Sequence, residues 1–190
     1  IVTALDGPNN GIPSETGFVI TPASELMAAL CLAEGLDDLR TRIDEMLLGY
    51  TFSGEPFTTK DLGVTGAITA LLRDAILPNL VQTLEGCPAV LHGGPFANIA
   101  HGCNSIMATK TAMQYGDYVV TEAGFASDLG AEKFFNIKCR KAGLQPAMTV
   151  LVATSQALKL SGGITEDKMM LPDMAALTIG LRNMEKHIAI

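Results

Sequence analysis

Residues 89–105 read Ala-Val-Leu-His-Gly-Gly-Pro-Phe-Ala-Asn-Ile-Ala-His-Gly-Cys-Asn-Ser, and this stretch decides the fold that we expect. Its apolar start, 89–91, is typical of the end of a buried strand. Gly93, Gly94 and Pro95 then force the chain out of the sheet before a helix can begin. Such a turn exposes backbone amides where an anionic ligand can reach them. The histidines, asparagines and serine crowded into the same stretch indicate a site rather than a core.

The same rhythm of strand, polar loop and helix is repeated three times from about residue 84 onward. The expected strands are 89–91, 118–121 and 149–153, and the expected helices are roughly 104–115, 129–141 and 155–160. This alternation predicts right-handed crossovers and a parallel sheet. In open sheets of this kind the ligand crevice lies beyond the carboxyl ends of the strands. We therefore expect the segments that begin at His92, Glu122 and Thr154 to share one rim.

The first part of the chain has a different pattern, a mixture of short strands and helices. We expect strands at 1–5 and 17–21, a hairpin over 47–58, and helices at 26–33, from 37 onward and at 65–76, the first of them started by Thr21 and Pro22. The predicted division is a small two-layer α+β subdomain at residues 1–83 and part of a parallel-sheet nucleotide-binding domain at residues 84–190. A last amphipathic helix is expected to begin at Asp173.

Composition excludes several classes of protein. With 190 residues, 48% hydrophobic and 17% charged, the chain is expected to fold as an ordinary globular domain rather than to be disordered. Its net charge of −7 and scattered basic residues argue against a nucleic-acid surface. No apolar run reaches the ~18 residues of a membrane span, and no signal peptide is visible. Four widely spaced cysteines predict reduced thiols in a cytoplasmic protein.

A zinc site is one alternative interpretation of the same stretch. Cys103 could bind the metal together with His92 or His101, as in a zinc hydrolase. The paired-ligand spacing typical of such sites is missing, so we predict no resident metal site from the sequence.

The segment that follows the second expected strand carries further candidate residues. Glu122 ends a buried strand, where a carboxylate is costly unless it is paired or hydrated, and it could hold a cation or orient a substrate amine. Asp128 either caps the next helix or belongs to the site. Phe125 either stacks on a planar ring or fills the loop.

The histidines have two interpretations each. His101 and Asn104 flank Gly102 at the start of an expected helix, an arrangement suited to donating hydrogen bonds to phosphoryl oxygens. His92 is either a second donor of this kind or a histidine that orients the loop without touching a ligand.

Several of these strings resemble a known enzyme family. Residues His92 to Ser105, Asp117-Tyr-Val-Val-Thr-Glu-Ala-Gly-Phe125 and Asp128-Leu-Gly-Ala-Glu-Lys-Phe134 closely resemble formate–tetrahydrofolate ligases, also called formyltetrahydrofolate synthetases. Asp74-Ala-Ile-Leu-Pro-Asn-Leu-Val-Gln-Thr-Leu-Glu85 and Ala23-Ser-Glu-Leu-Met27 are similar to the same family. The similarity runs from end to end of the chain.

The resemblance implies an ATP-dependent ligase of one-carbon metabolism. In that family ATP and Mg2+ activate formate to formyl phosphate, and the formyl group then passes to N10 of tetrahydrofolate; a monovalent cation, K+ or NH4+, commonly supports the reaction. The implied fold is a P-loop NTPase-like parallel sheet with smaller appended domains, and the implied assembly is a cytoplasmic homotetramer. This chemistry agrees with a site built from backbone amides and histidine donors beside an anionic intermediate.

The resemblance also assigns roles to residues. Glu122 and the backbone of Gly124 to Ala126 are expected to place the intermediate, and His101 or Asn98 to donate to its oxygens. The residues expected to bind substrate or nucleotide are His92, Gly93, Gly94, Phe96, Asn104, Ala123, Gly124, Phe125, Ala126 and Asp128.

The chain departs from the family pattern in ways that bear on activity. The family's G-x-x-x-x-G-K-[ST] phosphate loop is not found, so we expect a central fragment that is inactive alone and needs the missing parts of its own chain. Gln156 stands where the family usually has Arg and Ser161 where it usually has His; Val19 replaces a usual Asp and Ser14 a usual Arg. Ala126-Ser127 replaces a usual Gly-Ala. These changes leave open a non-catalytic paralogue that serves assembly or binding.

Overall fold

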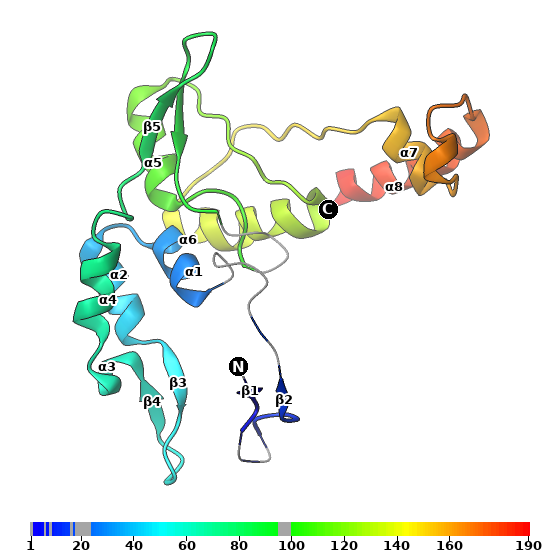
Figure 1. Ribbon diagram of the computed structural model, residues 1–190. Coiled ribbons are helices and arrows are strands. Elements are labelled where there is room, and N and C mark those ends of the chain that lie inside the picture. The colour runs from blue at the N-terminus through cyan, green and yellow to red at the C-terminus, as the bar shows by residue number, and fades with distance from the viewer. Residues whose placement is uncertain (1, 6, 8, 16, 18–23, 95–99) are drawn as a thin grey trace.

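The computed structural model describes residues 2–5, 7, 9–15, 17, 24–94 and 100–190 (Figure 1). In this part of the chain, helices alternate with short strands, and each strand belongs to a two-stranded antiparallel sheet. The elements are β1 (Val2–Thr3), β2 (Ser14–Glu15), α1 (Glu25–Leu32), α2 (Leu36–Asp44), β3 (Leu47–Tyr50), β4 (Pro56–Thr58), α3 (Thr59–Leu62), α4 (Thr65–Leu72), β5 (Asn79–Gln82), β6 (Pro88–Leu91), α5 (Ile106–Tyr115), η1 (Ala126–Ala131), η2 (Phe134–Cys139), α6 (Arg140–Ala142), α7 (Ser155–Ser161), η3 (Glu166–Lys168) and α8 (Met174–Ala189).

The main core lies between α1, α2 and α4. Cys31, Leu39 and Ile43 are fully buried there, and Met107 of α5 packs against the same cluster. Helix α1 begins at Glu25, and its cap residue Ser24 accepts a hydrogen bond from the Met27 backbone through its hydroxyl. The start that we predicted at Thr21 and Pro22 lies outside the described residues.

The predicted hairpin over 47–58 is confirmed. Strands β3 and β4 pair antiparallel, with Tyr50 opposite Pro56. The turn is closed by hydrogen bonds between Thr51 and Glu55 and by the Thr51 carbonyl, which accepts from the Gly54 backbone. The strand that we expected at 17–21 falls largely outside the described residues, and the partner of β1 is Ser14–Glu15.

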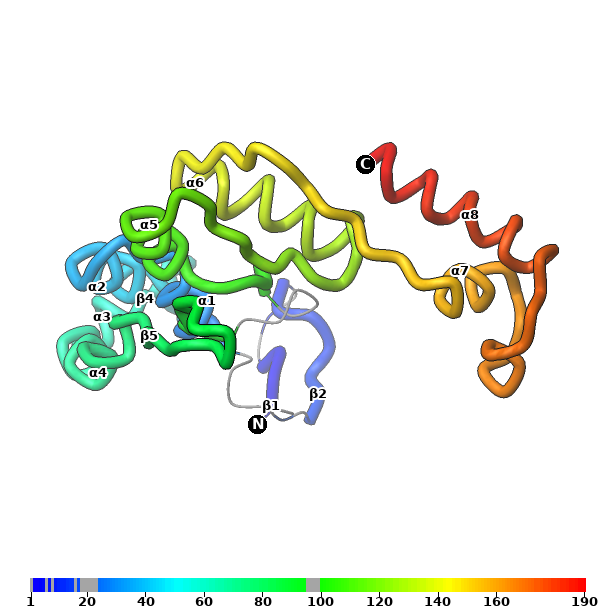
Figure 2. Tube along the Cα trace, turned by 90° about the horizontal axis from the view of Figure 1, so that it is seen from above, coloured from blue at the N-terminus to red at the C-terminus, as the bar shows by residue number. Residues whose placement is uncertain are grey.

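The predicted parallel sheet is not present in the described residues, whose strands form antiparallel pairs only. Of its three expected strands only 88–91 is a strand, and it pairs antiparallel with β5 (Asn79↔Leu91 to Gln82↔Pro88). Residues 118–121 and 149–153 form no ladder with any described residue; 149–153 lie in the extended connection that runs from α6 toward α7 (Figure 2). An apolar segment becomes a strand only when a neighbouring strand satisfies its backbone groups, and neither segment has one here.

The helices of the second half match the expected positions. Thr154 caps α7 and Asp173 caps α8, each through a hydrogen bond to a backbone amide three residues on. The helix expected at 129–141 is an almost continuous helical stretch from 126 to 142 that contains wide π-helical turns in η1 and η2. Such turns are rare and are often found at functional sites.

The boundary that we predicted between residues 83 and 84 falls inside the turn of the β5–β6 hairpin. The Thr83 amide donates to the Cys87 carbonyl there, so this position is a tight turn and not a linker. The division into two domains remains a prediction.

Candidate functional site

The loops after β6 and after residues 118–121 meet at a cavity of about 390 Å³. Three segments of the described chain line it, residues 90–94, 103–104 and 120–125. The lining residues are Val90, Leu91, His92, Gly93, Gly94, Cys103, Asn104, Val120, Thr121, Glu122, Gly124 and Phe125. Two of the three predicted loops therefore share one rim. Thr154 is not among the lining residues.

His92 is held by hydrogen bonds through both ring nitrogens. Its Nε2 lies 2.7 Å from the Ala75 carbonyl oxygen, and its Nδ1 lies 2.6 Å from the Ser105 hydroxyl. Because a carbonyl only accepts, Nε2 of the neutral ring carries the proton and Nδ1 accepts from Ser105. The Ser105 hydroxyl in turn accepts from the Ala108 backbone at 2.9 Å and so caps α5. This arrangement favours the interpretation of His92 as a residue that orients the loop.

Unusual backbone conformations cluster beside the cavity. Gly93 has φ of 70°, which costs a glycine little. Cys103, Phe125 and Ala126 have φ of 60°, 68° and 69°, in the left-handed region that L-residues with a Cβ rarely adopt. Strained backbone of this kind is concentrated at functional sites, because the surrounding structure must hold it in place.

Glu122 reaches the cavity from a loop that a helix supports closely. The glycine at 130 is buried in η1, and a Cβ added there would overlap the carbonyl group of Gly124. The helix can therefore approach the loop 122–125 only because residue 130 has no side chain. Glu122 itself is exposed, so its carboxylate is accessible to a ligand.

His101 lies in a second cavity, of about 450 Å³, and not in the one that Glu122 lines. Its ring nitrogens each lie 3.2 Å from a carbonyl oxygen, of Gly102 and of Ala28, and its side chain is buried. Burial lowers the pKa of His101 below its usual range, and the nearby Lys138 and Lys133 lower it further, whereas the hydrogen bond with Ala28 opposes the shift. A neutral, buried His101 contacts α1 rather than the space beside Glu122.

The remaining predicted residues do not all lie at this cavity. Asn104 lines the cavity, and its Oδ1 accepts a hydrogen bond from the Thr109 hydroxyl at 3.0 Å. Asp128 instead pairs with α8, 3.4 Å from Lys186 and 3.8 Å from His187. Ala123 and Ala126 are not among the lining residues. Asn98 and Phe96 lie outside the described residues, so their predicted roles stay predictions.

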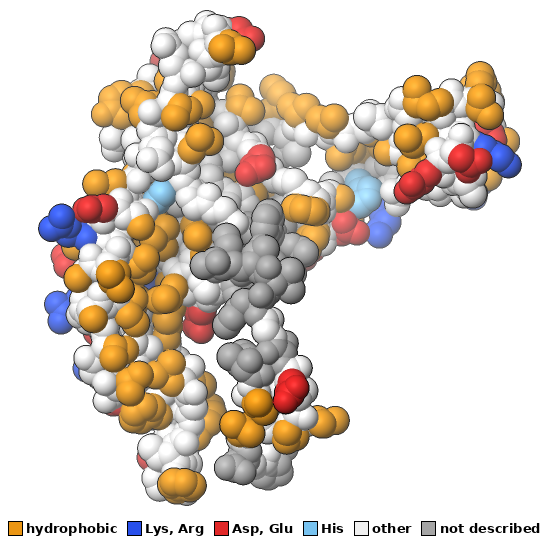
Figure 3. Space-filling model, in the orientation of Figure 1, with side chains coloured by type: hydrophobic (Ala, Val, Ile, Leu, Met, Phe, Trp, Pro, Cys, Tyr) orange, Lys and Arg blue, Asp and Glu red, His pale blue; other side chains and the backbone are white. Residues whose placement is uncertain are grey.

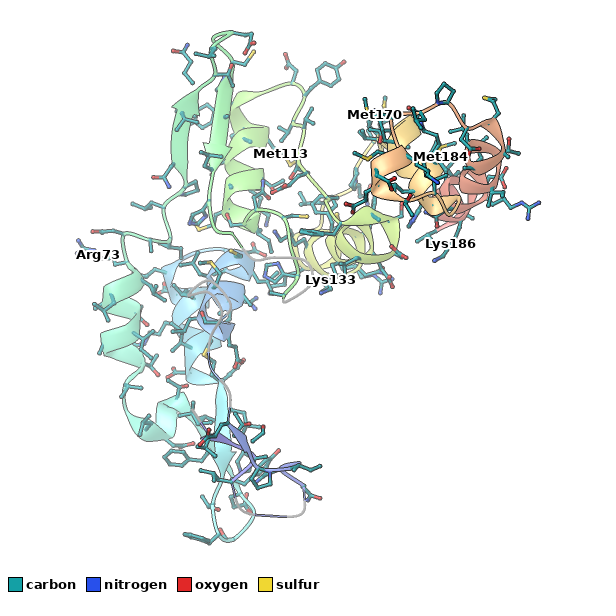
Figure 4. The ribbon with its side chains drawn as sticks, turned by 45° about the vertical axis from the view of Figure 1, so that its right-hand side comes forward. Arg73, Met113, Lys133, Met170, Met184 and Lys186 are labelled. Carbon is teal, nitrogen blue, oxygen red and sulfur yellow. The ribbon has the colours of Figure 1, made fainter. Side chains whose placement is uncertain are left out.

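Sequence reasoning missed the charged residue behind the cavity, Lys138. Lys138 is 1% exposed, and its Nζ finds no hydrogen-bond acceptor among the residues that the structure describes. Burial lowers the pKa of Lys138 to about 8, while Cys103, Cys31, Glu122 and Cys139 oppose the shift. A lysine on an amphipathic helix usually lies on the solvated face, so no local pattern marked this one. Lys133, in the same helical stretch, donates to the Ala100 carbonyl at 2.6 Å (Figure 4).

In the described part of the chain, no group of three or more His, Cys, Asp or Glu residues is placed to hold a metal ion. None of the helices in this part of the chain has the length and apolar character needed to cross a membrane.

Comparison with known proteins gives one consistent match. The family model for formate–tetrahydrofolate ligase matches residues 1–190. The chain is 65% identical over 188 residues to the formate–tetrahydrofolate ligases of Bacteroides fragilis and Bacteroides thetaiotaomicron, and 61% identical over 188 residues to that of Paracoccus denitrificans. Each match covers 99% of this chain and 34% of the relative, so the chain spans about a third of the length of the curated relatives it matches. From the full-length match to the family model, we conclude that this chain belongs to the formate–tetrahydrofolate ligase family.

Proposed function

We propose that the complete protein containing these residues is an ATP-dependent formate–tetrahydrofolate ligase, and that the cavity beside Glu122 holds part of its reaction centre. The observation that carries the proposal is the convergence of the Gly93–Gly94 loop with the Glu122–Phe125 loop in a chain of this family. Both loops are among those expected from the sequence to hold an anionic intermediate. ATP, Mg2+ and a monovalent cation are proposed cofactors, and cytoplasmic location and a homotetramer belong to the same proposal.

The proposed reaction has two steps. A formate oxygen attacks the γ-phosphorus of ATP, and the bond from that phosphorus to the bridging oxygen breaks, which releases ADP and leaves formyl phosphate. N10 of tetrahydrofolate then attacks the formyl carbon, phosphate leaves with the electron pair of the broken C–O bond, and N10 loses a proton. Mg2+ would supply charge neutralisation at the phosphoryl group.

The residues of this chain have positioning roles in the proposal. Backbone amides of the Gly93–Gly94 loop offer hydrogen-bond donors without adding a side chain, and donors placed in advance stabilise developing negative charge. Glu122 is an acceptor in the same cavity and is suited to orient the amine or to take its proton. His92 and Ser105 hold the first loop against α5.

We further propose that residues 118–121 and 149–153 are strands of a parallel, P-loop NTPase-like sheet in the complete protein. Their apolar side chains support this, since Val120 and Val152 are more than four fifths exposed in the described structure. The departures at Gln156 and Ser161 lie on α7, outside the lining of the cavity, and thus do not favour a non-catalytic paralogue.

The test is the activity of the complete protein with Glu122→Gln. We expect a loss of at least about tenfold in kcat, or ~1.4 kcal/mol of barrier, with an unchanged Tm, because the amide keeps the shape but neither the charge nor the basicity of the carboxylate. The measurement is ADP release that depends on formate and tetrahydrofolate. Glu132→Gln, an exposed residue outside the cavity lining, is the matched control. Unchanged kinetics in Glu122→Gln would remove Glu122 from the mechanism.

The isolated 190 residues are expected to show no turnover in the same assay.

A further inference from the structure

The cavity beside Glu122 contains a carboxylate but no cation. Among its described lining residues Glu122 is the one charged side chain, and none is lysine or arginine. Residues 95–99, next to it in the sequence, are Pro-Phe-Ala-Asn-Ile and carry no charge either. An anion placed in such a cavity would be repelled by Glu122 unless a positive charge lay close by.

Lys138 supplies a positive charge behind the cavity wall. It is fully buried, and the ionisable groups that oppose the shift of its pKa come from four parts of the chain. Two of these, Cys103 and Glu122, line the cavity itself. The other two are Cys31 of α1 and Cys139, the neighbour of Lys138 in η2.

Among the residues that the structure describes, the ammonium group of Lys138 has no hydrogen-bond acceptor. Its Nζ is shielded from solvent and finds no acceptor, although a buried charge normally requires one. The three neighbouring thiols do not pair with it as anions, because burial raises the pKa of each of them above 9.0. Glu122 is the remaining negative neighbour. Lys159 is also buried, but its ammonium group has an acceptor, since its Nζ donates to the Leu171 carbonyl at 2.6 Å.

We propose that Lys138 is a positioning residue whose buried ammonium group balances Glu122 and so allows an anionic ligand to bind in the cavity beside that carboxylate. This inference rests on the proposed function for the nature of the ligand, a phosphate or acyl phosphate. Lys138 does not line the cavity, so it acts through its field on Glu122 and the ligand rather than by contact. A charge that has no acceptor among the described residues becomes favourable when the ligand brings a second negative charge.

The experiment compares Lys138→Met, Lys138→Arg and the matched control Lys159→Met in the complete protein. We expect Lys138→Met to lower kcat/KM for formate by at least about tenfold near neutral pH without lowering Tm, because it removes a charge that lacks a partner. Lys138→Arg should retain most of the activity. Lys159→Met should lower Tm and leave kcat/KM within about twofold, since it loses a structural hydrogen bond.

The pH profile separates a charge role from a packing role. The pKa of Lys138, lowered to about 8, means that its charge is present below that pH and is lost above it, so wild-type kcat/KM should fall as pH rises through about 8. The groups that face Lys138 do not titrate at that point: the thiols ionise above 9.0, and the pKa of the neighbouring His101 is lowered below 6.5. In Lys138→Arg this alkaline limb should move to higher pH, because a guanidinium group keeps its proton.

Three results would overturn the proposal. The first is a kcat/KM in Lys138→Met that equals the wild-type value. The second is a loss of kcat/KM in Lys138→Arg as large as that in Lys138→Met. The third is an alkaline limb of the pH profile that stays at the same pH in Lys138→Arg. The last decides the matter even if Lys138→Met fails to fold. If the complete wild-type protein has no ligase activity, the proposed function fails. The role of Lys138 is then tested by the binding of sulfate, which is a dianion at every pH tested. Its affinity should fall above about pH 8 in the wild type, and an affinity that stays constant would reject the role.

Discussion

At the scale of single residues, the site depends on a few residues whose backbone conformation or burial costs free energy. Cys103, Phe125 and Ala126 have left-handed backbone, and Lys138 is a buried cation without an acceptor in the described part of the chain. Each state costs free energy that a different residue would avoid, which is why such residues point to a function. His92 differs, since both its ring nitrogens are satisfied.

Ala126 offers a direct measurement of this cost. Its φ of 69° is one that glycine adopts without strain. We expect Ala126→Gly to raise the free energy of unfolding by about 1 kcal/mol, observed as a higher Tm of the complete protein. Ala70→Gly, on the exposed face of α4 with ordinary φ, should lower it by a similar amount. Equal effects of the two substitutions would contradict the argument.

At the scale of elements, close approach between backbones determines how helices meet the loops. Glycine at 130 lets η1 contact the Gly124 carbonyl. Where α7 packs against α8, Gly162 likewise lies against the Ala176 backbone and Gly180 against the Leu158 backbone. Asp128, at the start of η1, lies within ion-pair distance of Lys186 of α8, which Figure 4 labels. These contacts join the C-terminal helices to the helix behind the cavity.

Gly130→Ala tests whether this contact positions the Glu122 loop. Alanine normally stabilises a helix relative to glycine, but here its Cβ would overlap the Gly124 carbonyl group. We expect a loss of about 1–3 kcal/mol of stability and faster amide exchange in residues 122–125, measured by hydrogen–deuterium exchange. The control is Gly66→Ala in α4, where an added Cβ meets nothing within 4 Å and should stabilise by about 0.5–1 kcal/mol. A stabilising Gly130→Ala would show that the helix does not support the loop.

At the scale of the whole molecule, the described structure exposes much apolar surface (Figure 3). Tyr118, Val120, Val150 and Val152 are each more than 75% exposed, and all belong to the two segments that form no ladder. Exposed apolar segments with free backbone groups pair with other chains. The surface is therefore consistent with a chain that spans about a third of its relatives' length.

We expect the isolated 190-residue chain to associate through these segments. Sedimentation velocity at increasing concentration should show growing species, and Val120→Thr combined with Val152→Thr should reduce them because it removes apolar surface. Leu71→Thr, an exposed apolar position on α4, should have a smaller effect. Association that is the same in both variants would mean that other surfaces cause it.

The sequence by itself determined the local elements. Cap residues such as Asp173 and Thr154, the turn between 50 and 56, and apolar periodicity specify helices and hairpins because the interactions involved are between near neighbours in the chain. It also predicted that the loops beginning at His92 and Glu122 meet, and its long motifs indicated the family. Tertiary structure alone decided the pairing of 88–91 with 79–82, the separation of His101 from Glu122 and the burial of Lys138. These depend on which distant segments pack together, and strand pairing and side-chain burial exist only once those partners are in place.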